Sequence, residues 1–205
     1  MSISRKIVFN VPSLMPEAGP THPTESRPPA VPAPEPDGSG EVGSADARKL
    51  AMLVEVGQAL TGTLNLQAGL YGVLEVLQRR CDALRGAVTL LEEDSGMLVV
   101  EAALGYPRPA GRIRYRMGEG VTGTVAQSGT PAVVPRVSRE PRFLHRAAAR
   151  GQREEETTYI CVPITLDGGT VGTLAIEERY VPGREADRTV HALRIAAGMI
   201  AQGLR

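Results

Sequence analysis

Six arginines lie close together between positions 136 and 153, and three glutamates follow them directly. An arginine guanidinium binds a carboxylate through two parallel hydrogen bonds, so such a cluster suits a dicarboxylate ligand or an acidic protein surface. If residues 143–152 are helical, Arg142, Arg146 and Arg150 share one face of that helix. The same pattern also fits a solvent-exposed helix whose charges are balanced by the glutamates. The segment therefore predicts either an anion-binding wall or a charged surface.

The sequence shows no arrangement typical of a catalytic centre. A nucleophilic enzyme needs a nucleophile, a base and an orienting group in one place. His22 lies in a proline-rich segment, and neither His145 nor His191 has a cysteine, serine or acid at a telling spacing. Cys81 and Cys161 are far apart, without the CxxC pattern of a zinc site or the many cysteines of a disulfide framework. We expect no enzymatic activity, no metal and two buried thiols in a reducing cytosol.

Charge and hydropathy limit the partners of the chain. Lysines plus arginines equal aspartates plus glutamates at 23 each, so no overall field attracts a nucleic-acid backbone or an anionic membrane. Asn10 and Pro12 interrupt the first apolar run, and no long apolar stretch follows. We expect a cytoplasmic protein in which this chain makes no direct contact with nucleic acid or membrane.

The chain divides into a proline-rich tail and one domain. Nine of its 16 prolines fall between Pro12 and Pro36. Such a segment buries too little apolar surface to offset its ordering entropy. We therefore predict a disordered tail over residues 1–44, with residues 3–11 as an alternative short docking motif. Residues 45–205 form a single domain that is long enough to bury a core.

Helical periodicity marks both ends of this domain. A first helix is expected from about Ala45, capped by Ser44 or Asp46, and a last helix from about Glu185. The apolar face of the last helix fits a coiled-coil seam or, equally well, packing on its own sheet. Residues at the spacing of one helix face are Leu50, Leu53, Gly57, Leu60 and Leu64 in the first helix, Leu70, Leu74, Leu77, Cys81 and Leu84 in a second, and Val190, Leu193, Ala197, Ile200 and Leu204 in the last.

Six short strands are expected between these helices. Turn residues at 93–96 and 167–169 predict two hairpins. The strands should form one antiparallel sheet. They are predicted at residues 87–92, 97–103, 113–116, 132–134, 158–166 and 170–178.

The stretch YRMGEGVTGTVAQSGTPAVVPRV, residues 115–137, has a glycine at each turn. Gly118 and Gly120 stand where a strand must stop and a helix begin, because glycine adopts backbone angles closed to other residues. Gly129 follows the last helical turn, and Pro131 cannot continue the helix. Backbone amides at this helix start could hold the phosphate of a cyclic nucleotide, although turn geometry alone explains the same glycines.

This stretch resembles the GAF family of signal-sensing domains, specifically the amino-terminal GAF domain of NifA-type, Nif-specific regulatory proteins, which are sigma-54-dependent activators. The resemblance continues through residues 137–144, 159–164 and 171–176 and covers about 47–205. It implies an α+β fold in which helices flank a central antiparallel sheet of about six strands. It also implies that the amino- and carboxy-terminal helices pack together and that the protein is a homodimer formed through them.

The resemblance further implies a small-molecule pocket between the sheet and the arginine-rich segment. The family associations are 2-oxoglutarate as effector, and a PII-type signalling protein or the flavoprotein NifL as partner. A few GAF domains reduce free methionine sulfoxide with clustered cysteines, which Cys81 and Cys161 do not reproduce. The residues implied to lie near the pocket are Val134, Arg142, Phe143, Arg150, Tyr159 and Cys161.

The function that the resemblance implies is regulation of nitrogen-fixation genes. The domain would bind an effector or a signalling protein and thereby control the output of the activator. The ATPase and the helix-turn-helix of such activators have no counterpart in this sequence, and its end within a helical pattern favours a fragment of a longer activator. The alternative is a ligand-free GAF module that serves as a dimerisation or interaction domain.

Overall fold

The computed structural model describes residues 39–106, 113–144 and 155–205, and describes side chains from residue 47 onward. Of the tail predicted over residues 1–44, residues 1–38 lie outside the described residues, and residues 39–44 belong to a helix. The described elements belong to one compact unit. None of the helices in this part of the chain is both long and apolar enough to cross a membrane.

The predicted six-stranded antiparallel sheet is confirmed. Its spatial order is β3-β2-β1-β6-β5-β4, and both predicted hairpins, β1–β2 and β5–β6, are present. The longest strands therefore lie at the centre, where neighbours on both sides satisfy their backbone hydrogen bonds. The strands are β1 (Ala83–Glu92), β2 (Met97–Leu104), β3 (Arg114–Arg116), β4 (Ala132–Val134), β5 (Thr157–Leu166) and β6 (Gly169–Arg179).

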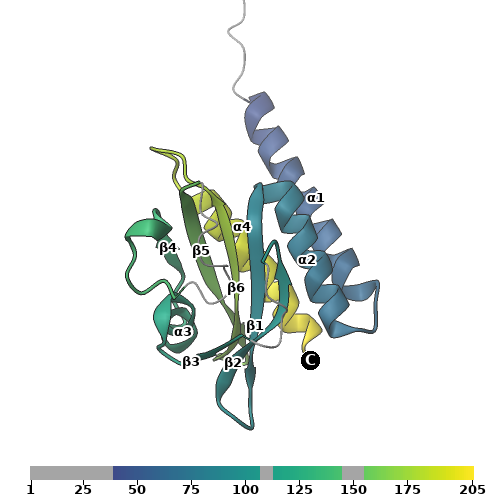
Figure 1. The fold of residues 1–205 in the computed structure, drawn as a ribbon. Coiled ribbons are helices and arrows are strands. Elements are labelled where there is room, and N and C mark those ends of the chain that lie inside the picture. The colour runs from purple at the N-terminus through teal and green to yellow at the C-terminus, as the bar shows by residue number, and fades with distance from the viewer. Residues whose placement is uncertain (1–38, 107–112, 145–154) are drawn as a thin grey trace, which may run out of the picture. The chain divides into compact units, whose positions relative to one another are not determined.

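Helices cover both faces of the sheet, and three of the four lie together (Figure 1). Helices α1 (Ser39–Thr61), α2 (Leu66–Cys81) and α4 (Asp187–Gly203) build the main core with one sheet face. Helix α3 (Gly120–Ser128) packs on the opposite face, in a second and smaller cluster. The sheet thus separates a thick helical layer from a thin one.

Helix α1 differs from the sequence prediction in its start and in its buried face. It begins at Ser39, so Ser44 and Asp46 lie inside the helix and do not cap it. No proline lies between Pro36 and the predicted helix start near Ala45, so no proline in these residues prevents an earlier start of the helix. Met52 and Val56 form its buried face, whereas Leu50 is 65 % exposed and Leu64 lies beyond the helix end. Leu53, Gly57 and Leu60 of the predicted face do pack against the core, so the prediction holds in the middle of the helix and is wrong for Leu50 and Leu64.

Helix α2 ends earlier than the predicted apolar face. Its C-cap residue, Asp82, has φ 53°, a left-handed conformation that stops the helix after Cys81. Leu84 therefore belongs to β1, where it is exposed. The new strand begins at Ala83, four residues before the predicted start.

The apolar face of α4 packs within the domain. Leu193, Ala197 and Ile200 are buried against the main core. The predicted packing of the first and last helices is also confirmed, since a Cβ added at Gly57 of α1 would lie 3.3 Å from Met199 Cε of α4. Of the two interpretations of this face, packing on the domain's own sheet is the one observed. Little of the face is therefore exposed for a coiled-coil seam.

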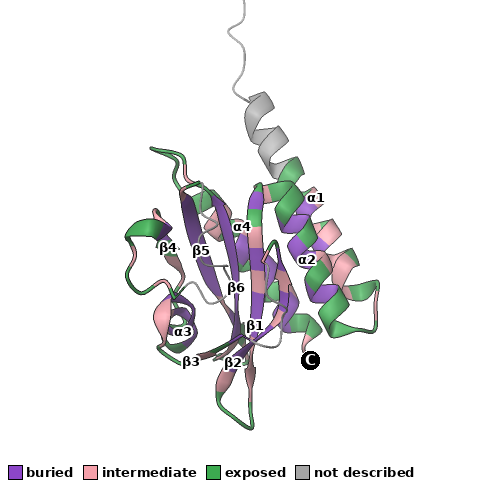
Figure 2. Cartoon of the chain, viewed as in Figure 1, coloured by how far each residue is buried: buried purple, intermediate pink, exposed green. Residues whose placement is uncertain are grey.

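Side chains alternate between the two layers along the central strands. In β5 and β6, Ile160, Ile176 and Leu174 face the helical layer, whereas Cys161 and Ala175 belong to the cluster under α3. Successive residues of a strand point to opposite sheet faces, so large apolar residues on one side coexist with small ones on the other. Figure 2 shows the result as strands that are buried on both faces.

The glycine-rich connection brings α3 very close to the end of β3. Gly118, Gly120 and Gly129 have φ values of 80°, 64° and 65°, as the sequence predicted for the two ends of the helix. The Gly118 N–H donates to the Gly123 carbonyl at 2.8 Å. A Cβ added at Gly123 would lie 2.2 Å from the Arg116 carbonyl oxygen, so no other residue fits there without moving the backbone.

We expect Gly123→Ala to destabilise the domain by about 2 to 3 kcal/mol, because the added methyl forces α3 away from β3. The matched control is Gly198→Ala on α4, where a Cβ meets nothing within 4 Å and the loss of helical glycine stabilises. Urea unfolding followed by circular dichroism measures both. Equal stabilities for the two variants would contradict the close approach at Gly123.

Candidate functional site

A cavity lies between the sheet and α3. Its floor is built from odd-numbered residues of β1 and β6, which pair across the strands as Ala87 with Ala175 and Thr89 with Thr173. The empty space is about 610 Å³ when the open solvent at its mouth is included. Cavity and floor thus follow from the strand register.

Small side chains on the floor create the empty space. Along one row across the sheet, Ala103 of β2 pairs with Ala87, Ala87 with Ala175, and Ala175 with Cys161 of β5. A methyl group rises little above the sheet, which leaves space over Ala87 and Ala103, whereas Ala175 and Cys161 belong to the cluster that contains Val121 of α3. The rows on either side carry longer side chains that close the cavity.

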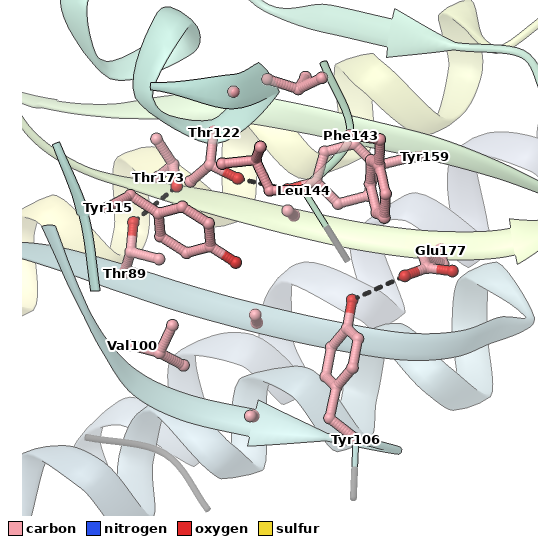
Figure 3. Close-up of a pocket in the computed structure, with 15 residues that line it drawn as sticks. Thr89, Val100, Tyr106, Tyr115, Thr122, Phe143, Leu144, Tyr159, Thr173 and Glu177 are labelled. Carbon is pink, nitrogen blue, oxygen red and sulfur yellow. Dashed lines mark hydrogen bonds between the residues drawn. The ribbon is translucent and has the colours of Figure 1, made fainter. Parts of the chain in front are cut away.

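Aromatic and apolar residues form the walls (Figure 3). Val121 and Thr122 of α3 face the floor, and Phe143 and Leu144 come from the loop after η1 (Val137–Arg139). The ring of Phe143 packs edge-on against Tyr159, with 4.9 Å between centroids. Val100 of β2, Tyr115 of β3 and Tyr106 of the segment after β2 also line the cavity.

Two pairs of hydroxyl groups lie in the cavity lining. Thr89 Oγ1 and Thr173 Oγ1 are 2.7 Å apart on the floor, and Thr122 Oγ1 and Tyr159 Oη are 2.9 Å apart between α3 and β5. Burial raises the pKa of Tyr159 well above its ordinary value, so this phenol keeps its proton. These hydroxyls can each donate to or accept from a ligand that enters.

A fully buried carboxylate closes one end of the cavity. Glu177 Oε2 accepts hydrogen bonds from Arg85 Nη1 and Thr157 Oγ1, both at 3.1 Å, and Oε1 accepts from Tyr106 Oη at 3.1 Å. Burial and the neighbouring carboxylate raise the pKa of Tyr106 well above its usual range, so it remains a donor. Arg85 and Glu177 form an ion pair, which offsets the cost of burying the charge.

The structure divides the predicted site residues into three groups. Phe143 and Tyr159 line the cavity. Val134 and Cys161 lie in the apolar cluster beside it and do not belong to its lining. Arg142 is 65 % exposed at the surface, where its Nε lies 2.9 Å from Glu140 Oε1.

The remaining predicted arginines fall in a part of the chain that the structure leaves undescribed. Arg150 and the proposed helical face with Arg146 lie within residues 145–154, outside the described residues. Leu144, the last described residue before this segment, lines the cavity. The anion-binding wall therefore stays a prediction.

The two cysteines lie in different layers. Cys161 belongs to the cluster under α3, whereas Cys81 packs against the main core on the other side of the sheet. Burial raises the pKa of Cys161 to about 12 and that of Cys81 to about 11, which keeps both as unreactive thiols at neutral pH. Within the described ranges, no group of three or more His, Cys, Asp or Glu is placed to hold a metal.

Sequence reasoning missed the residues that form the floor. Thr173, Ala175 and Glu177 alternate with the apolar Leu174 and Ile176 along one strand. Small or polar residues on one face of a strand, with large apolar residues on its other face, are the pattern from which the cavity side of the sheet could have been predicted. Glu177 lies next to Glu178 near the end of the strand, and two charged residues at a strand end usually indicate that the chain enters solvent there.

We expect Arg85→Met to destabilise the domain by about 3 to 5 kcal/mol, because it leaves the Glu177 carboxylate buried without a counter-ion. The control is Arg179→Met at the end of the same strand as Glu177. Arg179 pairs with Glu155 at the surface, where both side chains are more than half exposed, so its loss should cost about 1 kcal/mol or less. Urea denaturation gives the free energy of unfolding of both variants. A similar loss of stability in both would show that Arg85 does not stabilise the buried Glu177 carboxylate.

Comparison with known proteins agrees with this architecture. Residues 65–204 match the family described as GAF domain. The chain is 33 % identical over 158 residues to the nitrogen fixation protein VnfA of Azotobacter vinelandii, covering 76 % of this chain and 30 % of that protein. It is 34 % identical over 160 residues to the Nif-specific regulatory protein of Azospirillum lipoferum, covering 77 % and 26 %. The chain thus spans less than a third of these relatives.

Solved structures share the fold at lower identity. The A. aeolicus nlh2 GAF domain in an inactive state superposes with a TM-score of 0.69 at 21 % identity, over 78 % of this chain and 97 % of that one. The free methionine-R-sulfoxide reductase from Neisseria meningitidis, in complex with its substrate, gives 0.64 at 19 % identity, over 78 % and 89 %. The predicted GAF-like α+β fold is confirmed, and the chain belongs to the GAF domain family.

Proposed function

We propose that this chain is the regulatory domain of a NifA-like activator of nitrogen-fixation genes and that the cavity under α3 is its effector site. The cavity, built on the central strands of a GAF domain, is the observation that carries the proposal. Its relatives are Nif-specific regulatory proteins, which supports a regulatory and non-catalytic role. A mostly apolar lining with a few polar groups is typical of small-molecule sites.

The central strands supply a physical route from the cavity to the helices. Thr173 and Ala175 form part of its floor, and the residues between and after them, Leu174 and Ile176, pack under the helical layer. A ligand that moves this strand also moves the surface on which α4 and α2 rest. Coupling of this kind is typically about 1 to 3 kcal/mol, enough to shift an equilibrium between two helix arrangements.

The family resemblance makes 2-oxoglutarate the first effector to test. Its two carboxylates would require cationic partners, which the arginines of residues 145–154 could supply. A PII-type protein or a NifL-like protein remains a proposed partner of the regulator as a whole. Such a partner would act on the same helix arrangement that the effector biases.

We expect Ala87→Leu to abolish effector binding, because the larger side chain fills the floor of the cavity. Isothermal titration calorimetry with 2-oxoglutarate, with succinate and glutamate as competitors, measures the binding constant of the wild type and of this variant. A loss of at least tenfold is expected, since a blocked site leaves the ligand no enclosed surface. Urea unfolding of the variant checks that the domain remains folded.

Arg142→Ala separates the cavity from the surface arginines. If binding survives this change and is lost in Ala87→Leu, the effector lies in the cavity. If 2-oxoglutarate binds Ala87→Leu as well as it binds the wild type, the cavity is not the effector site. Loss in Arg142→Ala alone would place the anion at the surface loop.

An interaction role has its own supporting observation on α1. Leu50 and Val54, four residues apart on one side of this helix, are 65 % and 53 % exposed. Exposed apolar residues on adjacent turns of a helix suit pairing with another helix. We propose that this side of α1 contributes to a homodimer.

Replacing Leu50 and Val54 together by glutamate should weaken dimerisation by at least tenfold, because charges would then meet across the paired helices. Analytical ultracentrifugation over a concentration series gives the dissociation constant. Arg48→Glu, an exposed charge change on the same helix outside this pair, is the control. A wild-type chain that stays monomeric at all concentrations would contradict the proposed dimer.

A further inference from the structure

A second charged cluster lies outside the cavity, where η1 meets the start of β5. Ser138, the middle residue of η1, is exposed and donates two hydrogen bonds to Glu156. Its backbone N–H lies 3.1 Å from Oε1, and its hydroxyl group donates to Oε2. The bond from this hydroxyl is the largest of the contacts that lower the pKa of Glu156, so the carboxylate is ionised at neutral pH. Ser138 thus already holds an anion.

Arg136 is the cation of this cluster, and one of its donors has no acceptor. Its Nε atom is buried without a hydrogen-bond partner, the only side-chain atom of this kind in the described part of the chain. The distance from Nε to Glu156 Oε2 is 3.8 Å, which is too long for a hydrogen bond. The guanidinium lies over the ring of Tyr180, 4.8 Å from its centroid. Buried donors almost always have acceptors, so a further anionic oxygen at this place would satisfy Arg136.

A phosphoryl group on Ser138 would supply this oxygen. The group would be attached to Oγ, the atom that now donates to Glu156 Oε2, and would occupy the space of the carboxylate beside Arg136 Nε. A phosphoserine carries about −1.5 to −2 charges at pH 7 and three strong acceptor oxygens, so it would repel Glu156. The side chain of Glu156 is 24 % exposed and can turn toward water. Arg136 would then gain a charge-assisted hydrogen bond.

The residues around Ser138 suit recognition by a kinase. Ser138 is the only serine in the sequence with an arginine two residues before it, and Arg139 follows it. Kinases select substrates partly by such charge patterns. The turn is held by few backbone bonds, from the Arg139 N–H to the Arg136 carbonyl at 3.0 Å and from the Glu140 N–H to the Val137 carbonyl at 3.3 Å. Local opening of so short a turn gives a kinase access to the hydroxyl.

We infer that Ser138 is a phosphorylation site and that Arg136 binds the phosphate in place of Glu156. The γ-phosphoryl group of ATP is transferred by a serine kinase that selects arginine before the serine. The bond from Pγ to the leaving ADP oxygen breaks, a bond from Pγ to Ser138 Oγ forms, and the hydroxyl proton passes to the base of the kinase. This inference goes beyond the proposed effector site, since none of these three residues lines the cavity.

The exchange of partners would loosen the start of β5. Glu156 comes directly before Thr157, the first residue of β5, whose hydroxyl donates to Glu177 at the end of the cavity. The Tyr180 N–H donates to the backbone carbonyl of Glu156 at 3.0 Å and does not depend on the carboxylate. The strand would therefore stay in the sheet but lose its side-chain connection to η1.

A kinase reaction on the intact chain tests the site. The chain is incubated with ATP and a purified kinase catalytic subunit that recognises arginine two residues before serine, and mass spectrometry of its peptides locates the phosphate. We expect one phosphoryl group, on Ser138, and none in Ser138→Ala. Ser95 and Ser128 are exposed serines without an arginine or lysine within three residues, and they are controls within the same chain. A chain that stays unmodified at Ser138, or is modified equally at all three serines, would overturn the inference.

The exchange of partners is tested with a chain that carries phosphoserine at position 138, introduced by genetic code expansion. In the unmodified chain, Glu156→Gln should raise the equilibrium constant of unfolding about two- to tenfold, because it weakens the bonds from Ser138. In the phosphorylated chain it should not raise this constant, because the carboxylate has been displaced. Arg136→Met should raise it about fivefold more in the phosphorylated chain than in the unmodified one, as expected for a charge-assisted hydrogen bond.

Arg205→Met is the control for these unfolding measurements. Arg205 pairs with Asp167 at 2.6 Å, away from this cluster, so its loss should have the same effect in both chains. If Arg136→Met costs equal stability with and without the phosphate, Arg136 does not bind it and the inference is wrong. The same holds if Glu156→Gln destabilises both chains equally. Neither result affects the proposed effector site, because the variants leave the lining of the cavity unchanged.

Discussion

The alternation of side chains along β1, β5 and β6 is the constraint on which the rest of the structure depends. One set of residues, including Leu174 and Ile176, is fully buried under α1, α2 and α4 and supplies most of the core. The other set is fixed by the same backbone to face α3, and its members, such as Ala87 and Ala175, are small. A one-residue shift of register would exchange the two sets and lose both the core and the cavity.

The buried ion pair adds specificity to this arrangement. Arg85 and Glu177 are directly opposite each other on β1 and β6, in the same cross-strand ladder that pairs Ala87 with Ala175. A carboxylate with no exposed surface can keep its hydrogen bonds only in one register, so any alternative pairing of the strands would leave it unsatisfied. Thr157 of β5 and Tyr106 of the segment after β2 also donate hydrogen bonds to Glu177, so the position of this carboxylate is linked to both segments.

Most of the fold could be predicted from the sequence, because its strands are bounded by strong turn residues and its glycines mark the ends of α3. The errors fall where local pattern and tertiary contact disagree. Leu50 fits a helical stripe, yet α1 turns the neighbouring Met52 and Val56 toward the core. Phe143 and Tyr159 were predicted near the site through the family resemblance. Glu177 was not, because its role arises from Arg85, which is 92 residues away along the chain but opposite it across the sheet.

The cavity and the helical layer share the same strands, and the proposed regulation of the domain depends on this arrangement. A residue such as Thr173 contacts the cavity while Leu174, next to it, contacts the core, so the backbone between them cannot move on one side alone. Close-packed cores respond to such displacements by shifting between discrete arrangements, since they deform little continuously. A domain whose floor were filled by larger side chains would keep its core but lose the space of the proposed effector site. The small residues of the floor therefore cost some packing, and in the proposed function they couple the strand positions to the contents of the cavity.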